Sequence, residues 1–383
     1  MIKTLIAHTF EVDEVEEAIS EIIDSINPRR NLLKNSIGIM ACSLDFIENG
    51  TVRGLCSRLP FDVVGIDSLG CAVSGDGGAN MLALAVLTSD DAFFSAGLSE
   101  SMRRDYEEPL AEVYSKTSAR LSGKPALILA FAPFVLRRSV DYFVKYLDLL
   151  SGGVPLFGGM PSDFTTEFRK PLVIYNGEAY ADSLAIVLVS GNVSPKFTLS
   201  AISTNKTIKM RAIVTASEGN ILKKINDELS VSFIRSLGLF KDDNTMALRA
   251  TPIVLHFDDG APPALRVIGG VTPEGYLFLG GTAPVGCAIT IGAVGYDDIM
   301  ETASIATADV TRNRSDFLLV ISCMTRNFVM GLDNMDEINH FRATLGGDIP
   351  FLFMYTAGEL CPVEAKGAFI NRYHNLTLVT CAF

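Results

Sequence analysis

Side chains capable of chemistry gather in the last third of the sequence, each beside an apolar, strand-like run. Cys323 ends one such run, and three residues later Arg326 offers a planar fork of donors suited to a carboxylate or phosphate. The alternative for Arg326 is an ion pair with Glu359 or contact with solvent. The segment 355–359 combines an aromatic ring, a hydroxyl, a flexible glycine and a carboxylate, a mixture that suits a small polar ligand, although Glu359 is equally suited to a structural role.

His374 and Asn375 open the final apolar run. A neutral imidazole can contact a ligand, act as a general base or ligate haem, and a purely structural role is an equal alternative. Cys323 and His374 would form a nucleophile–base pair only within hydrogen-bond distance, and no oxyanion loop is recognisable. No His or carboxylate pair has the usual metal-ligand spacing. We therefore expect no catalytic residue and no metal, with a Cys323-dependent hydrolase or transferase as the less favoured alternative.

These residues belong to a unit that occurs three times: an apolar strand, an amphipathic helix, a second apolar strand with a Gly-bearing loop, and a closing β-rich run. The second strands begin at Pro60, Pro155 and Pro350. The spacing within each unit fits a strand–helix–strand crossover. In open α/β sheets ligands bind at the carboxyl ends of strands, so we expect the site in the loops that follow these strands.

We accordingly predict an α/β fold of repeated strand–helix–strand–strand units, forming mixed sheets covered by helices in two interlocked domains. One sheet or several would satisfy the pattern. The remaining elements follow from apolar spacing. They are a strand over 2–10, a helix over 15–26, a helical segment over 99–122 that Pro109 kinks or divides in two, a helix over 221–237, hairpins over 252–295 and a helix over 296–313. A turn-rich break at 190–195 precedes a boundary near residue 205, which gives domains 1–205 and 206–383.

Composition narrows the function classes. The 383 residues carry a net charge of −12, which repels nucleic acid and anionic membranes. The apolar stretch 126–136 is too short to span a bilayer and contains Pro133. The N-terminus lacks the apolar core of a signal peptide, so we expect a cytoplasmic protein. Seven scattered cysteines without a CxxC pair do not indicate a disulfide framework or a zinc site.

The glycine-rich segment 74–80 resembles a phosphate-binding loop only superficially. It lacks the Lys and Ser/Thr of a P-loop and is not an intact GxGxxG motif. Turn chemistry alone accounts for its composition.

Several motifs, taken in order, resemble the FIST family over nearly the whole chain. The segments that resemble its N-terminal domain are Val64–Gly70, Gly153–Gly159 with Asp163, and Asp182–Val187. Those that resemble its C-terminal domain are 218–222, Ile225–Asp227, Cys323–Arg326, Tyr355–Glu359 and His374–Thr377.

The resemblance implies an intracellular sensory module that binds an amino acid or related metabolite for signal transduction, with no cofactor. It also implies a set of ligand contacts: Cys323, Arg326, Tyr355, Gly358, Glu359, His374 and Asn375, with Gly158, Gly159 and Asp163. Some relatives resemble haem-based gas sensors, so haem held by His374 or His256 is the alternative. Because the chain ends directly after its last strand, we expect no fused output domain and a signal passed to a separate signalling protein. The oligomeric state is left open.

Overall fold

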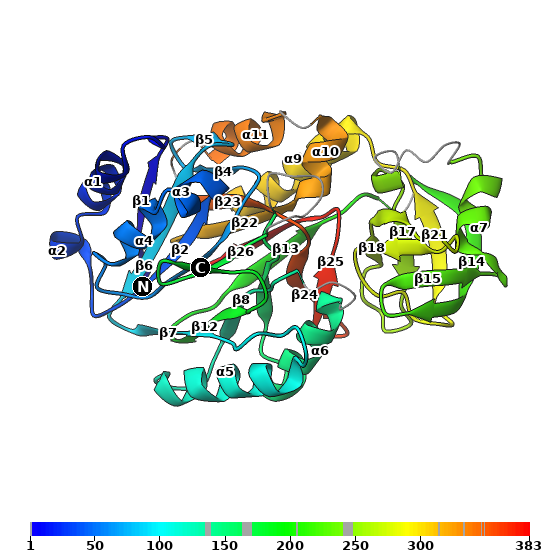
Figure 1. The fold of residues 1–383 in the computed structure, drawn as a ribbon, viewed down its shortest axis with the longest axis horizontal. Coiled ribbons are helices and arrows are strands. Elements are labelled where there is room, and N and C mark those ends of the chain that lie inside the picture. The colour runs from blue at the N-terminus through cyan, green and yellow to red at the C-terminus, as the bar shows by residue number, and fades with distance from the viewer. Residues whose placement is uncertain are drawn as a thin grey trace.

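The computed structural model describes residues 2–134, 139–162, 171–203, 206–239, 248–312, 315–331, 334–345, 347 and 349–383. Three six-stranded sheets form the main body, and an eight-stranded sheet forms a smaller β unit at one end of the molecule (Figure 1). The three repeats of the sequence thus form separate sheets, and the predicted mixed α/β fold is confirmed.

Each sheet of the main body has the same arrangement of strands. The first, in spatial order, contains β1 (Ile2–Thr9), β6 (Leu82–Ser89), β2 (Asn35–Cys42), β3 (Val63–Asp67), β10 (Val173–Tyr175) and β11 (Glu178–Tyr180). The second contains β7 (Ala92–Leu98), β12 (Ala185–Gly191), β8 (Leu127–Phe131), β9 (Leu156–Gly159), β24 (Glu359–Ala365) and β25 (Ala368–His374). The third contains β13 (Lys196–Ser200), β26 (Leu378–Ala382), β22 (Leu318–Cys323), β23 (Phe351–Thr356), β4 (Cys71–Val73) and β5 (Gly77–Gly78).

The repeats exchange strands in a closed cycle. In each sheet the two strands of the crossover run parallel, and the closing strand pairs antiparallel with the first of them. The strand that follows β3 in the first repeat, β4, pairs with β23 in the third sheet. In the same way β24, which follows β23, pairs with β9 in the second sheet, and β10, which follows β9, pairs with β3 in the first sheet. Because every repeat lends a strand to another, strands from the two halves of the chain share sheets, as the predicted interlocking requires.

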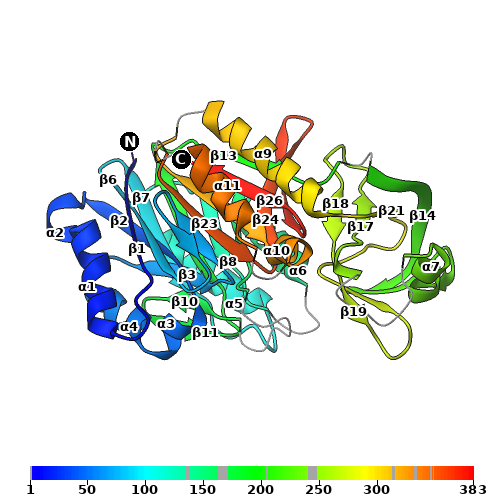
Figure 2. The same ribbon diagram turned by 90° about the horizontal axis from the view of Figure 1, so that it is seen from above.

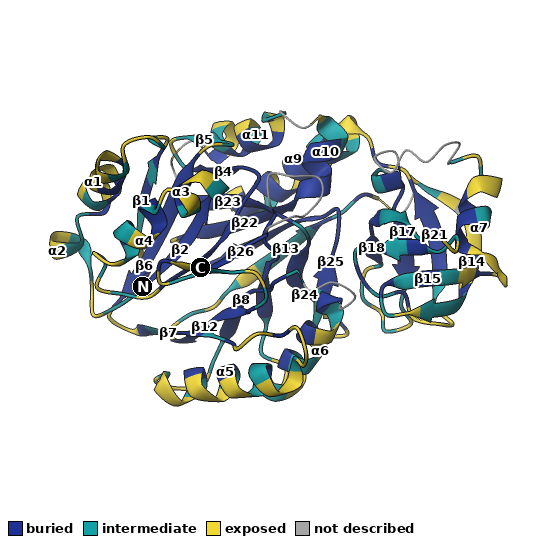
Figure 3. Ribbon diagram, viewed as in Figure 1, coloured by how far each residue is buried: buried dark blue, intermediate teal, exposed yellow. Residues whose placement is uncertain are grey.

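Helices cover the outer faces of the sheets, and a common apolar core lies between the inner faces. The first sheet carries α1 (Val15–Ile26), α3 (Leu44–Glu48) and α4 (Thr51–Cys56), and the short α2 (Pro28–Asn31), which buries no residue, follows α1. The second sheet carries α5 (Glu107–Arg120) and α6 (Val140–Ser151), and the third carries α9 (Tyr296–Arg312), α10 (Met324–Met330) and α11 (Asp336–Leu345). Figure 2 shows α9 and α11 lying over the strands of the third sheet. Residues of all three sheets form one central cluster, which includes Ile39, Leu129 and Leu319. These strands read as continuous apolar runs because both of their faces are buried (Figure 3).

The smaller β unit has an apolar core of its own. Its strands, in spatial order, are β18 (Ala264–Arg266), β17 (Ile253–His256), β21 (Ala288–Gly292), β14 (Thr207–Glu218), β15 (Ile221–Ile225), β20 (Leu277–Leu279) and β19 (Ile268–Val271), with β16 (Glu228–Leu229) beside β15 and α7 (Ser230–Ser236) packed on them. In sequence, the unit is inserted between β13 and α9 of the third repeat. The predicted boundary near residue 205 falls at the start of this insertion, and the division into domains 1–205 and 206–383 stays a prediction.

Two local predictions are wrong. Residues 221–237 do not form one helix: β15 and β16 occupy the first part, and only α7 is helical. Asn226 and Asp227 adopt positive φ values of 50° and 67°, which makes a tight turn where a helix would have to continue. The segment 99–122 holds one helix, α5, and Pro109 lies in its first turn, where a missing N–H breaks no helical hydrogen bond.

Candidate functional site

The loops that follow the second strands of the three repeats meet in the interior of the main body. Ser162 Oγ donates to the Tyr355 carbonyl at 2.8 Å, and Ser68 Oγ lies 3.0 Å from the same oxygen. The Leu69 amide donates to Ser162 Oγ at 3.1 Å. The repeats therefore bring the carboxyl ends of β3, β9 and β23 together, where the sequence places its candidate residues, but this meeting point is buried.

Three of the predicted contacts are glycines that allow the strands to cross here. Gly158 and Gly159 pair with Leu360 and Glu359 as β24 enters the second sheet. At Gly158 (φ 150°) a Cβ would lie 1.9 Å from the Ala130 carbonyl oxygen, and at Gly358 (φ 151°) it would lie 2.2 Å from the Tyr373 hydroxyl. Close packing against the Ala130 backbone and the Tyr373 side chain explains the glycines at 158 and 358. Their role as ligand contacts stays a prediction.

Glu359 is a fully buried carboxyl group beside Cys323. Its Oε2 accepts hydrogen bonds from the Thr377 hydroxyl at 2.7 Å and the Thr377 amide at 3.2 Å, and Thr356 Oγ1 lies 3.3 Å from Oε1. Burial raises the pKa of Glu359 to about 8, although the bonds from Thr377 oppose this shift, so the group is mostly protonated at neutral pH. Burial, with a smaller contribution from Glu359, raises the pKa of the Cys323 thiol and disfavours the thiolate that a nucleophile needs.

Arg326 is paired inside the protein, and its partner is Glu337 instead of the predicted alternative, Glu359. Both side chains are 0% exposed. Arg326 Nε lies 2.9 Å and Nη2 2.5 Å from Glu337 Oε1, and Nη2 also donates to the Ile299 carbonyl. Ser322 Oγ donates to the second carboxylate oxygen of Glu337 at 2.8 Å. This pair joins α9, α10, α11 and β22.

Three buried polar atoms close to this pair have no hydrogen-bond partner among the described residues. They are Arg326 Nη1, Asn327 Oδ1 and the Tyr355 hydroxyl. The Tyr355 hydroxyl faces Asn327 and Glu337 without forming a hydrogen bond of good geometry, and burial, then the charge of Glu337, raises its pKa well above the ordinary value. Since buried polar groups are nearly always paired, this polar cluster of Arg326, Asn327, Tyr355 and Glu337 has unused capacity to bind water or a ligand.

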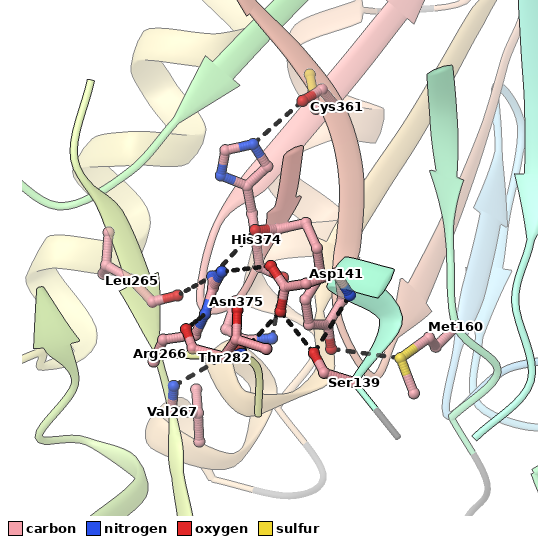
Figure 4. Close-up of polar contacts among 11 residues, drawn as sticks. Ser139, Asp141, Met160, Leu265, Arg266, Val267, Thr282, Cys361, His374 and Asn375 are labelled. Carbon is pink, nitrogen blue, oxygen red and sulfur yellow. Dashed lines mark hydrogen bonds and ion pairs between the residues drawn. The ribbon is translucent and has the colours of Figure 1, made fainter. Parts of the chain in front are cut away.

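His374 and Asn375 lie where the smaller β unit meets the main body (Figure 4). The His374 Nε2 lies 3.1 Å from the Cys361 carbonyl oxygen, and its Nδ1 has no partner among the described residues. Burial, with the charge of Arg266 second, lowers the pKa of His374 to about 3, so the ring is neutral at physiological pH. Asn375 Oδ1 accepts from the Val267 amide at 3.4 Å and its Nδ2 donates to the His374 carbonyl.

Arg266 fastens the two units together at this junction. Its Nη2 donates to Asp141 Oδ1 at 2.7 Å, Nη1 to the Leu265 and Tyr373 carbonyls and Nε to the Thr282 carbonyl, each at 3.0 Å (Figure 4). The Thr282 amide donates to the other oxygen of Asp141 at 2.8 Å. Arg266 is 2% exposed, and its donors serve protein acceptors, which indicates a structural link.

The predicted ligand contacts therefore fall into two neighbouring groups. Cys323, Arg326, Tyr355, Gly358 and Glu359 gather around the ends of β22 and β23, with Gly158 and Gly159 alongside, whereas His374 and Asn375 border the smaller unit. Asp163 lies outside the described residues. As ligand contacts, all of them remain predictions. His256 lies in β17, with Nε2 2.9 Å from Thr290 Oγ1.

Sequence reasoning missed Glu337, Asn327, Arg266 and Asp141. A signal for Glu337 was available, because residues 337, 341 and 345 share one helix face and the other two are Phe and Leu. A carboxylate at such a position must find a buried partner. The partner itself, Arg326, lies on a different helix and could not be named from spacing.

None of the helices in the described ranges is long and apolar enough to cross a membrane, and the predicted cytoplasmic location stays a prediction. A comparison with curated proteins finds no match. Among solved structures, the chain is similar to the cyanuric acid hydrolase from A. caulinodans, with 7% identity, a TM-score of 0.33 and coverage of 100% of this chain and 99% of that one. A likeness this low carries no argument about activity.

Family comparison gives a clear result. Residues 36–228 match the FIST N domain, and residues 225–362 match the FIST C domain. The order agrees with the motifs that resemble each domain in the sequence. FIST domains are associated with sensing and signal transduction. With one domain directly following the other over residues 36–362, this chain belongs to the FIST family.

Proposed function

We propose that the protein is a sensor that binds an amino acid or a related small metabolite at the polar cluster of Arg326, Asn327, Tyr355 and Glu337. The observation that carries this proposal is the unused hydrogen-bonding capacity of three of these side chains in the protein interior. The family's association with signal transduction supports a sensory role.

The chemistry of the cluster suits a ligand with both donors and acceptors. Arg326 Nη1 can donate to a carboxylate oxygen, Asn327 Oδ1 can accept from an ammonium group, and the Tyr355 hydroxyl can do either. Glu359 nearby is mostly protonated at neutral pH because its pKa is raised to about 8, so it would add a donor. Interactions of this kind inside a protein are strong because no water competes with them.

Ligand binding would act by shifting the populations of conformations. It can shift them only as far as the ligand's affinities for those conformations differ. The strand exchange offers a physical route, since β24 begins at Glu359 and continues into the second sheet. A separate signalling protein would read the change. Binding without catalysis is part of the proposal, and the buried, protonated thiol of Cys323 supports it.

A thermal-shift and calorimetric screen against amino acids and related metabolites tests this function. A ligand at a hundred times its dissociation constant stabilises the protein by about 2.7 kcal/mol. The sharpest variant is Tyr355→Phe, because it removes a hydroxyl that faces Asn327 and Glu337 without a hydrogen bond of good geometry, so the stability of the unliganded protein should change little. The matched control is Tyr296→Phe, whose hydroxyl bonds to Asp336 at the surface. A ligand that binds both variants equally well would place the site elsewhere.

Haem remains the alternative, and one observation favours it: His374 provides a neutral imidazole whose Nδ1 is unpartnered. Haem would supply reversible binding of a diatomic gas, and His374 would be the residue that holds it. His256 fits less well, since Thr290 already occupies its Nε2. Titration with haemin tests this directly. A Soret band of bound haem that is unchanged in both His374→Ala and His256→Ala would exclude axial ligation by either residue.

A further inference from the structure

A pocket of about 420 Å³ lies between the main body and the smaller β unit, apart from the polar cluster of the proposed function. Phe197 and Leu199 of β13 and Pro362 of β24 form its wall on the main body, and Val254 and Leu265 form the facing wall. Its volume falls within the range of small-molecule sites.

Aromatic and apolar contacts hold the residues that line this pocket, which we call the junction pocket. The ring of Phe197 stacks on Phe157, with 6.1 Å between centroids, and meets Phe369 edge-on at 5.7 Å. Val254 and Leu265 belong to an apolar cluster that also contains Ile299 and Leu376 of the main body. The pocket therefore borders the packing that joins the two units, and an occupant would touch both of them.

The charges of the lining decide which ligand fits. Among the lining residues, Glu364 alone is charged, and the rest are apolar except for Thr207. The Glu364 side chain is exposed on β24, where it lies opposite Phe369. A carboxylate at the mouth of an apolar pocket attracts an ammonium group and repels a second carboxylate.

We propose that the junction pocket binds a small aromatic or aliphatic amine that lacks a carboxylate, with its apolar part against Phe197 and Leu265 and its ammonium group beside Glu364. Such a ligand would bridge the two units and favour the arrangement in which they are in contact. The protein would then respond to two chemically different molecules: the amine here, and the amino acid or related metabolite of the proposed function at the polar cluster.

The chain contains no tryptophan, so a single introduced tryptophan reports binding by its fluorescence. Phe197→Trp places this reporter in the pocket wall. Phenethylamine and phenylalanine are the probes, because they differ only by the carboxylate. We expect a saturable fluorescence change with phenethylamine, and binding of phenylalanine that is weaker by roughly two- to fivefold or more, since its carboxylate would lie beside the exposed carboxylate of Glu364.

Two matched variants complete the test. Adding Glu364→Gln to the reporter protein should weaken phenethylamine binding by roughly two- to fivefold, the range of an exposed ion pair, whereas Glu108→Gln on α5 should have no effect. Phe10→Trp, in the first repeat, should give no saturable signal. Calorimetry on the chain without the reporter repeats the comparison of the two probes and of Glu364→Gln, and keeps the test valid if Phe197→Trp does not fold.

Absence of saturable phenethylamine binding, equal binding of both probes, or no effect of Glu364→Gln would each overturn the proposal. None of these results touches the proposed function, which depends on ligand binding that is sensitive to Tyr355→Phe. Conversely, loss of the Tyr355 site would leave the amine titration unchanged. The two proposals can therefore fail separately.

Discussion

Replacing Glu337 by glutamine tests whether the pair with Arg326 holds the third repeat together. The substitution keeps the shape of the side chain but removes its charge. Arg326 would then retain a full positive charge with 0% exposure, and the bonds from its Nε and Nη2 to Glu337 Oε1, at 2.9 and 2.5 Å, would lose their charged acceptor.

The expected cost is large because solvent cannot replace the lost partner. Breaking a buried ion pair by removing one charge costs about 3–5 kcal/mol. The Ile299 carbonyl, which accepts from Nη2, offsets only part of this loss. With a urea dependence of about 3 kcal/mol per M, the unfolding midpoint should fall by roughly 1 M or more. Arg326→Ala should destabilise the protein for the same reason, by leaving Glu337 as an unpaired buried charge.

Urea unfolding followed by far-UV circular dichroism measures this effect. The matched control is Glu178→Gln, because the surface pair of Arg53 and Glu178 has a similar N···O distance of 2.6 Å but side chains that are 71% and 49% exposed. We expect no measurable shift of the midpoint for this control.

The double variant Arg326→Met, Glu337→Gln separates charge burial from packing. It removes both charges and should recover much of the stability lost in Glu337→Gln alone. If Glu337→Gln or Arg326→Ala unfolds at the same urea concentration as the parent protein, the pair does not stabilise the fold. Arg326 would then be free to serve mainly as a ligand contact.

Three further results are expected. Because the pKa of Glu359 is about 8 in the folded protein and near 4.5 when unfolded, its stabilising contribution is complete below about pH 4.5 and is lost as the pH rises through 8. The difference in unfolding midpoint between the parent protein and Glu359→Gln, measured at pH 5, 6.5 and 8, should therefore change with pH. A constant difference would contradict the raised pKa. Gly358→Ala should lower the melting temperature strongly, since the new Cβ would lie 2.2 Å from the Tyr373 hydroxyl. The control Gly270→Ala, with nothing within 4 Å of its Cβ, should leave the melting temperature nearly unchanged. Equal melting temperatures of the two variants would refute the close packing at Gly358. Asp141→Asn should weaken the link through Arg266 and lower the free energy of unfolding by about 2 kcal/mol or more. It should also speed hydrogen exchange in β18, and unaltered exchange there would show that the link is dispensable.

Periodicity determined much of the main body before any contact was known. Apolar runs such as 37–42, 127–131 and 318–323 predicted buried strands, and the interval to the next run predicted a crossover helix. The spacing of Val15, Ile19, Ile22 and Ile26 predicted α1 with its buried face. These predictions succeeded because they depend on local geometry, in which side-chain direction repeats with a fixed period.

In the smaller β unit, apolar periodicity alone predicted the wrong structure because it does not detect local turns. The apolar positions of 221–237 fit a helical period, yet the positive φ values at Asn226 and Asp227 and the antiparallel pairing of β15 with β16 give a hairpin there. Short apolar segments are ambiguous between the two structures, and tertiary pairing decides between them.

The sequence by itself determined the repeat, the strand and helix content of the main body and the group of residues in which to search for a site. Only the tertiary structure decided that the repeats form three sheets linked by strand exchange, that Arg326 pairs with Glu337, and that a pocket with a single charged residue lies between the two units. The physical reason is that periodicity reports which face of an element is buried, whereas an ion pair or a pocket depends on which elements, distant in sequence, lie against each other.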